Sequence, residues 1–180
     1  MSASGDHGSR TASAPSRYGF RTLARTDLPL VAEWLAEPHV REWWGDPAEE
    51  LALIEGDLDE PGMGLSLVTF DGRPFAYVQN WDVLRYGDPF GQGPGTIGVD
   101  PFIGVPEMVG RGHGSRFLRA FVDGLIAAGA RRVIIDPDPA NLRAIRCYGK
   151  AGFDPIGEVQ LPDGPVLLMA RDADNRKTTT

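Results

Sequence analysis

A chain of 180 residues suits one domain with a single sizeable core, and its 42% hydrophobic and 24% charged residues are ordinary for a soluble globular protein. The net charge of −7 argues against nucleic acid as a partner and is compatible with a cationic ligand, although it also simply favours solubility. No apolar run is long enough for a membrane span, so we expect no membrane partner.

The single cysteine, Cys147, excludes an internal disulfide framework and a cysteine-based metal cluster, and no metal is expected. Residues 1–16 are small and polar without an apolar core, which predicts a disordered tail rather than a signal peptide. We therefore expect a cytoplasmic protein with one domain over residues 17–171 and a flexible C-terminal tail over 172–180.

The first third of the domain predicts a strand and two helices. Residues 18–24 alternate as a strand does, and Thr26 or Asp27 is placed to cap a helix. One face of that helix carries Leu30, Val31, Trp34 and Leu35. Residues 39–45 are expected to be irregular, and a second helix is expected over 47–58.

The middle of the chain predicts three strands. Residues 65–70 and 75–81 are strand candidates, joined by the hairpin dipeptide Asp71-Gly72. A glycine- and proline-rich loop follows, and then an apolar strand over 97–105 that is kinked near Pro101.

The last third alternates helices and strands. A helix is expected over 114–128, a buried strand over 132–136, a helix over 141–151 that ends at Gly152, and two strands around Val159 and 166–169. The order β-α-α-β-β-β-α-β-α-β-β predicts a mixed α/β fold.

A glycine-rich turn, residues 109–115, opens the helix of the last third. Glycines at 110, 112 and 114 let backbone N–H groups converge, and the helix N-terminus adds its positive dipole end. Arg111 and Arg116 could add charge against phosphate oxygens. The turn has neither a Walker motif nor the full dinucleotide fingerprint, so a plain tight turn remains the alternative to phosphate binding.

The turn and the segment from Asn141 to Phe153 together resemble the GNAT acetyltransferases, with Val109 in place of the family's usual Gln or Arg. Within that superfamily the chain is similar to the aminoglycoside 6′-N-acetyltransferases and to the kasugamycin 2′-N-acetyltransferases. The similarity lies in Glu42-Trp43-Trp44-Gly45, Tyr77-Val78-Gln79, Val99-Asp100, Asp136-Pro137, Leu142-Arg143-Ala144-Ile145-Arg146-Cys147-Tyr148 and Pro162-Asp163-Gly164-Pro165. The resemblance implies one GNAT-like domain with a mainly antiparallel sheet flanked by helices.

The resemblance also implies site residues. Acetyl-CoA as co-substrate would be held by Gly110, Arg111, Gly112, His113, Gly114, Ser115, Arg116 and Asn141. A cationic aminosugar would be bound by Trp44, Gln79, Asp100, Asp136 and Asp163. For His113 in the turn, and for His39, a purely structural role is the alternative interpretation. Trp43 is interpreted as a core anchor and the cysteine as a small core residue.

Acetyl transfer to an amine needs a proton acceptor for the ammonium and a donor for the departing thiolate. By resemblance, Asp100 is the base and Tyr148 the acid, in direct transfer within a ternary complex. Structural alternatives remain open: Asp100 or Asp136 as turn residues before prolines, Tyr148 as a packing residue, and Asn141 as a helix cap.

The function expected is acetylation of a 6′ or 2′ amine of an aminoglycoside, conferring resistance, by a monomer or homodimer. Two alternatives stay open. One is an acyltransferase for a siderophore precursor, a polyamine or a protein N-terminus. The other is a non-catalytic module that binds acyl-CoA or drug.

Overall fold

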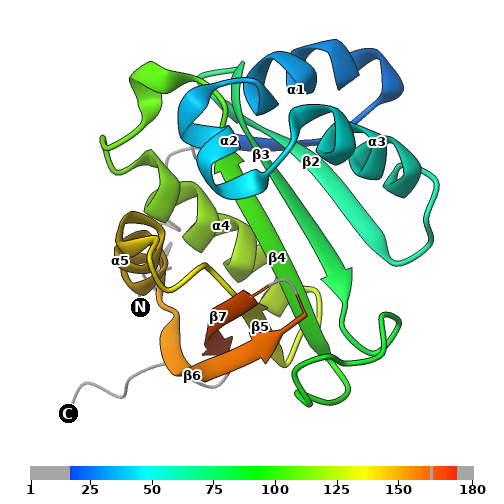
Figure 1. Cartoon of the computed structure of the whole chain (residues 1–180), viewed down its shortest axis with the longest axis vertical. Coiled ribbons are helices and arrows are strands. Elements are labelled where there is room, and N and C mark those ends of the chain that lie inside the picture. Colours follow the sequence, from blue (N-terminus) through cyan, green and yellow to red (C-terminus); the bar gives the residue numbers. More distant parts are fainter. Residues whose placement is uncertain (1–16, 163, 174–180) are drawn as a thin grey trace, which may run out of the picture.

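The computed structural model describes residues 17–162 and 164–173. The tail expected over 1–16, most of the tail expected over 172–180, and Asp163 lie outside the described residues. A seven-stranded sheet of order β1-β2-β3-β4-β5-β7-β6 forms the centre of the fold (Figure 1). Its strands are β1 (Tyr18–Thr22), β2 (Met63–Phe70), β3 (Arg73–Asp82), β4 (Thr96–Ile103), β5 (Arg132–Ile135), β6 (Asp154–Leu161) and β7 (Gly164–Asp172). All neighbouring pairs are antiparallel except β4 with β5, which confirms the mainly antiparallel α/β fold.

Five α-helices and two short 3-10 turns are present in the described residues. The helices are α1 (Leu28–Leu35), α2 (Pro38–Trp44), α3 (Pro47–Asp57), α4 (His113–Ala127) and α5 (Leu142–Ala151), and the turns are η1 (Arg25–Asp27) and η2 (Pro106–Met108). The hairpin between β2 and β3 forms at the expected dipeptide, where Asp71 and Gly72 both have positive φ, of 49° and 79°.

The prediction that residues 39–45 are irregular is wrong, because α2 occupies this segment. Glu37 is extended at the N-cap and Pro38 takes the first helical turn, where its missing N–H and fixed φ are favourable. Val40 anchors the helix in the core, and Gly45, with φ 94°, ends it. Reading the Glu-Pro pair as the end of one helix missed that it starts another.

The C-terminal boundary also differs from the expected one. β7 continues to Asp172, whose carboxylate accepts a hydrogen bond from Arg132 Nε at 2.6 Å. The last strand therefore includes the first residue of the predicted tail.

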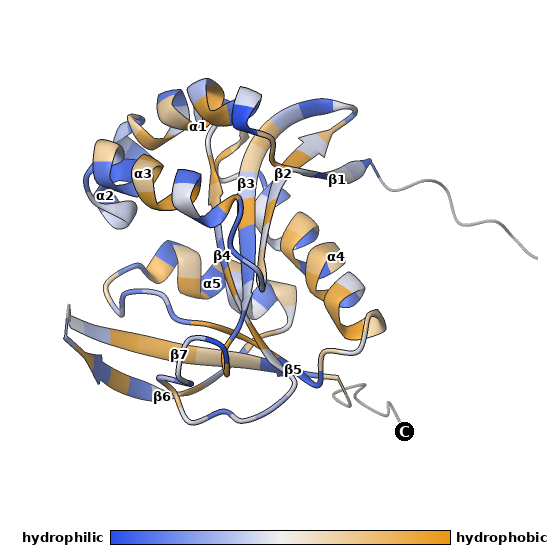
Figure 2. Cartoon of the chain, turned by 90° about the vertical axis from the view of Figure 1, so that its right-hand side faces the viewer, coloured by the Kyte–Doolittle hydropathy of each residue, from blue (hydrophilic) through white to orange (hydrophobic). Residues whose placement is uncertain are grey.

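Two faces of the sheet carry separate helical layers. Alternate residues of β2 and β3, such as Leu67 and Tyr77, pack against α1–α3, whereas their neighbours Val68, Ala76 and Val78 pack against α4. Figure 2 shows α4 and the α1–α3 group on opposite sides of the strands. In the described residues, no helix is both long and apolar enough to cross a membrane.

The parallel pair β4–β5 separates partway along β4. Their pairing runs from Thr96↔Arg132 to Gly98↔Ile134, but β4 continues to Ile103. Among the described strands, none pairs with β4 on that side beyond Gly98. The resulting opening between β4 and β5 positions the site.

Candidate active site

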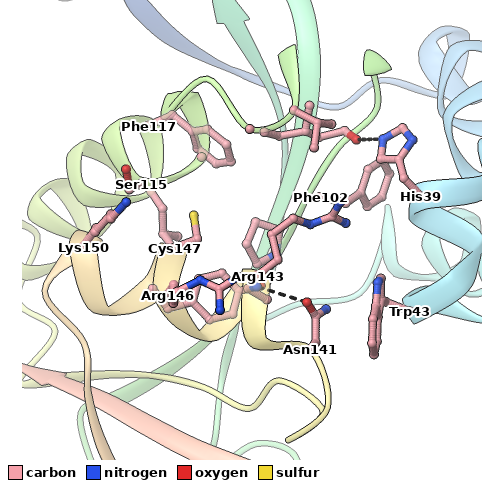
Figure 3. A pocket seen from close by; sticks show the side chains of 18 of the residues that line it. His39, Trp43, Phe102, Ser115, Phe117, Asn141, Arg143, Arg146, Cys147 and Lys150 are labelled. Carbon is pink, nitrogen blue, oxygen red and sulfur yellow. Dashed lines mark hydrogen bonds between the residues drawn. The ribbon is translucent and has the colours of Figure 1, made fainter. Parts of the chain in front are cut away.

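A cavity of about 280 Å³ lies between the free end of β4 and helices α2, α4 and α5 (Figure 3). Its apolar wall includes Phe102, Phe117 and Leu118, and the glycine turn forms part of its rim. Figure 3 shows side chains from both α5 and α2 around this space.

The glycine turn has the backbone conformation that the sequence suggests. Gly110 and Gly112 have φ of 75° and 78°, in the left-handed region that only glycine adopts readily. Gly112 is the N-cap of α4, so the free N–H groups of that helix begin directly after the turn. Gly110, Gly112, Gly114 and Ser115 all line the cavity. The free N–H groups at the start of α4 therefore lie beside the cavity, an arrangement that suits an anionic ligand.

Gly114 has a different role from the other two glycines. A Cβ built on Gly114 would lie 2.8 Å from Sγ of Cys147. The missing side chain therefore allows close packing of α4 on α5. Burial raises the pKa of the Cys147 thiol to about 11, which agrees with its interpretation as a small packed residue.

The cationic side chains of the cavity come from α5, and sequence reasoning missed them. Arg143, Arg146 and Lys150 line it at spacings of three and four residues, which places them on one face of the helix. Arg111 and Arg116 of the turn, in contrast, are exposed and do not line this cavity. The helical spacing of the three α5 cations was the signal available in the sequence.

The side chains of His39 and His113 are each held by a hydrogen bond within the protein. His113 Nδ1 lies 2.8 Å from the hydroxyl of Tyr18, and its ring packs edge-on against Phe70 and Phe75 outside the cavity. The side chain of His113 is thus directed away from the proposed coenzyme site, and only its backbone belongs to the turn. His39 Nε2 lies 2.8 Å from the carbonyl oxygen of Ile103, at the edge of the cavity (Figure 3).

Asn141 caps α5. Its Oδ1 accepts a hydrogen bond from the Ala144 N–H at 3.0 Å (Figure 3). Asn141 also lines this cavity and a second, neighbouring cavity. The capping alternative is therefore correct, and it leaves the amide nitrogen available to a ligand.

A second cavity, of about 320 Å³, adjoins the first. Both cavities are lined by Trp43, Trp44, Pro101, Asn141 and Tyr148. The acidic residues of the second cavity are Glu50, Asp100, Asp136 and Asp138, and its described lining contains no basic side chain. A cavity with cationic side chains therefore meets an acidic cavity at a shared wall.

Asp100 is one of the carboxyl groups that line the acidic cavity. Its Oδ2 accepts hydrogen bonds from Gln79 Nε2 and Trp81 Nε1, both at 3.1 Å, and the hydroxyl of Tyr77 donates to Gln79 Oε1 at 2.8 Å. Burial raises the pKa of Asp100, while the two donors oppose that rise. Tyr77 and Trp81 were not anticipated, although Trp81 is two residues from Gln79 on the same strand face.

Two further carboxyls share this environment. Burial, with a contribution from the charge of Asp100, raises the pKa of Asp136 to about 7. Burial also raises the pKa of Glu50 on α3, a residue that sequence reasoning did not single out. The pocket therefore concentrates negative charge that a polycation would neutralise.

Tyr148 occupies the wall between the cavities, on α5. Burial raises the pKa of its phenol well above the ordinary range, so the group remains protonated at neutral pH. Its ring also lies 6.4 Å from that of Phe153. Tyr148 therefore both packs against a core ring and lines the two cavities.

The two tryptophans of α2 differ from the expectation that Trp43 is a core anchor. Trp44 packs its ring edge-on against Phe102 and Tyr77, at centroid distances of 4.8 and 6.1 Å. Trp43, interpreted as a core anchor, belongs to no core cluster and lines both cavities. The reason is helical geometry: consecutive residues on α2 point in different directions, and Val40 and Trp44, four apart, share the inner face.

The chain is similar to known acetyltransferases over most of its length. The acetyltransferase (GNAT) domain model matches residues 24–161. The chain is 34% identical to aminoglycoside N(6′)-acetyltransferase type 1 of Klebsiella pneumoniae, over 84% of this chain and 81% of that one. It is 42% identical to a kanamycin resistance protein of Rhizobium radiobacter, over 43% of this chain and 73% of that one. The solved structure of AAC(6′)-Ib with paromomycin and acetyl-CoA superposes with a TM-score of 0.82 at 31% identity, covering 91% of this chain and 99% of that one.

The fold, the paired cavities and these matches define the class of this protein as an acetyltransferase. The chain belongs to the GNAT acetyltransferase family, and the resemblance to aminoglycoside N(6′)-acetyltransferases is confirmed.

Proposed function

We propose that this protein transfers the acetyl group of acetyl-CoA to the 6′-amine of an aminoglycoside and thereby confers resistance. The observation that carries the proposal is the junction of the two cavities: a cleft with cationic side chains and an anion-binding turn opens onto an acidic pocket at Tyr148. Such a junction suits a polyanionic donor and a polycationic acceptor that must meet.

On the donor side, the N–H groups after Gly112 would bind the coenzyme pyrophosphate. Arg143, Arg146 and Lys150 add positive charge, while apolar residues such as Phe117 flank the narrow arm of the ligand. The relative AAC(6′)-Ib is described in complex with coenzyme A and kanamycin together, which supports a ternary complex.

On the acceptor side, Asp100, Asp136, Glu50 and Gln79 are placed to bind ammonium and hydroxyl groups of an aminosugar. Trp43 and Trp44 supply an aromatic wall beside these polar groups. We include Asp163 in this set because of the family resemblance alone.

The chemistry follows from Asp100 in the acidic cavity and Tyr148 in the wall that both cavities share. Asp100, directly or through water, accepts a proton from the substrate ammonium, and the free amine attacks the thioester carbonyl. The raised pKa of Asp100 makes it a better proton acceptor than an ordinary aspartate. As the carbon–sulfur bond breaks, the Tyr148 hydroxyl donates its proton to the departing thiolate. The second proton that the attacking nitrogen loses on becoming an amide passes to solvent, and solvent in turn restores the proton of Tyr148.

We place this activity in the cytoplasm, where acetyl-CoA is available, without a membrane or nucleic-acid partner. Size-exclusion chromatography with light scattering would distinguish a monomer from a homodimer.

The proposal is tested by incubating the protein with acetyl-CoA and, separately, kanamycin, gentamicin, neomycin and kasugamycin. Mass spectrometry should detect singly acetylated kanamycin and neomycin, and NMR should place the acetyl group on the 6′ nitrogen. Acetylation of kasugamycin in preference to the others would move the assignment to the 2′-amine. Acetylation of none of these compounds, including ligand binding by calorimetry without any product, would refute the proposed function.

A further inference from the structure

The proposed base, Asp100, is held by two donors that share one of its oxygens. Gln79 Nε2 and Trp81 Nε1 both donate to Oδ2. Within residues 17–162 and 164–173, no hydrogen bond is found to Oδ1. One oxygen is therefore fixed by the protein, and the other is available to an acceptor amine.

The orientation of Gln79 follows from its other partner. Because the Tyr77 hydroxyl donates to Oε1, the amide nitrogen is the end that faces Asp100. Both donors to Asp100 are consequently neutral N–H groups with defined directions.

The register of β3 and β4 explains how Trp81 reaches Asp100. Gln79 lies directly opposite Asp100, and Trp81 lies directly opposite Gly98. The four residues alternate onto one face of the sheet. A Cβ built on Gly98 would lie 2.2 Å from the indole ring, so the ring occupies the space that a side chain at position 98 would take. The absence of that side chain lets the indole N–H extend diagonally to Asp100.

The indole of Trp81 packs against other side chains and does not line either cavity. Its ring lies 5.9 Å from that of Tyr86 and packs on a cluster that includes Ile134 and Leu168. Trp81 lines neither cavity. A direct effect of Trp81 on the reaction would therefore act through its hydrogen bond to Asp100.

We propose that Trp81 is a positioning residue, whose indole N–H holds the Asp100 carboxylate with Oδ1 turned to the acceptor amine. This inference rests on the proposed function, in which Asp100 receives the proton of that amine. Trp81 and Gly98 act as a pair, because the tryptophan reaches the carboxylate only across a glycine.

The charges around Asp100 explain why the indole N–H affects the pKa of this carboxyl. The groups that face Asp100 are Tyr77 on β3, Glu50 on α3, Asp136 after β5 and Tyr148 on α5, and none of them is cationic. Burial already raises the pKa of Asp100, and the N–H groups of Gln79 and Trp81 lower it. Loss of one donor should therefore raise this pKa further.

The test uses Trp81→Phe, which keeps an aromatic ring but removes the N–H. The Asp100 pKa, followed by the ¹³C NMR shift of its Cγ, and the acid limb of the kcat/KM profile should both move to higher pH by about 0.5 to 1 unit. The acetyl-CoA dissociation constant should stay within about two-fold of the wild-type value, because Trp81 does not line the coenzyme cavity.

Gly98→Ala gives an independent arm, because it displaces the indole while keeping the N–H, and it should shift both readouts in the same direction. Both variants are also measured in an Asp136→Asn background, so that the titration of Asp136 does not overlap that of Asp100. If the NMR pKa and acid limb of Trp81→Phe coincide with those of the wild type while kcat falls, Trp81 only packs and the proposal is wrong. The NMR titration needs no turnover, so a wild-type protein that acetylates no aminoglycoside would refute the proposed function separately.

Discussion

Helices α4 and α5 touch where Gly114 faces Cys147: a Cβ built on the glycine would lie 2.8 Å from the cysteine sulfur. Both residues line the first cavity, where we propose that acetyl-CoA binds, so the contact is part of its wall. A methyl group here must displace the sulfur or separate the helices. We expect Gly114→Ala to lower the free energy of unfolding by about 1 to 2 kcal/mol and to weaken acetyl-CoA binding.

Denaturant titration and calorimetry measure these two effects. Gly124→Ala is the matched control on the same helix, where a new Cβ would meet nothing within 4 Å. It should stabilise the protein by about 0.5 to 1 kcal/mol. Adding Cys147→Ala to Gly114→Ala should restore most of the lost stability; an additive double variant would show that the two residues do not interact.

Tyr148→Phe removes the phenol that we assign to the departing thiolate while keeping the ring against Phe153. Steady-state kinetics should show kcat reduced by about 100-fold or more, with the KM of both substrates changed by only a few-fold. If only KM responds, Tyr148 binds substrate and does not act as the acid.

Asp136 makes stability depend on pH. Its pKa is raised to about 7 in the folded protein. An unfolded aspartate has a pKa of about 3.9. Between these values the folded state binds more protons at this site, so the site's contribution to the free energy of unfolding falls as pH rises through the window. The neutral variant Asp136→Asn escapes this loss. Its Tm relative to the wild type should therefore be higher at about pH 8 than at about pH 5, and an equal difference at both would contradict the assignment.

Arg146→Ala tests the cationic side of the coenzyme cavity. An exposed arginine beside a phosphate suggests an increase of about 3- to 10-fold in the acetyl-CoA dissociation constant, and the effect should weaken at high salt. The KM for S-acetylpantetheine, which has the thioester but no phosphate, should stay unchanged. Arg73→Ala, on an exposed strand end away from both cavities, is the control. An equal loss with both thioesters would mean that the arginine does not contact phosphate.

Local patterns made much of the fold predictable. Asp71-Gly72 marked the β2–β3 hairpin, and the apolar face of α4 and the Gly152 C-cap of α5 defined their elements. Helix α2 was missed because Pro38 can end one helix or begin the next, and only packing of Val40 in the core decides between them.

Site residues that belong to a local sequence motif could be predicted, whereas those brought together only by the tertiary fold could not. Tyr148 lies in the wall shared by the two cavities, and Asp100 lines the acidic one. Trp81, in contrast, gains its contact with Asp100 only through the strand register opposite Gly98, which no local pattern reveals. Glu50 reaches the same pocket from a helix distant in sequence.

The central claim is that the acidic pocket presents a 6′-amine to the thioester at Tyr148. The most direct measurement compares neomycin with paromomycin, which has a hydroxyl in place of that amine, by mass spectrometry after incubation with acetyl-CoA. We predict that neomycin gains one acetyl group and that paromomycin remains unmodified. Equal acetylation of both would contradict the claim, because the reacting nitrogen would then lie elsewhere on the sugar.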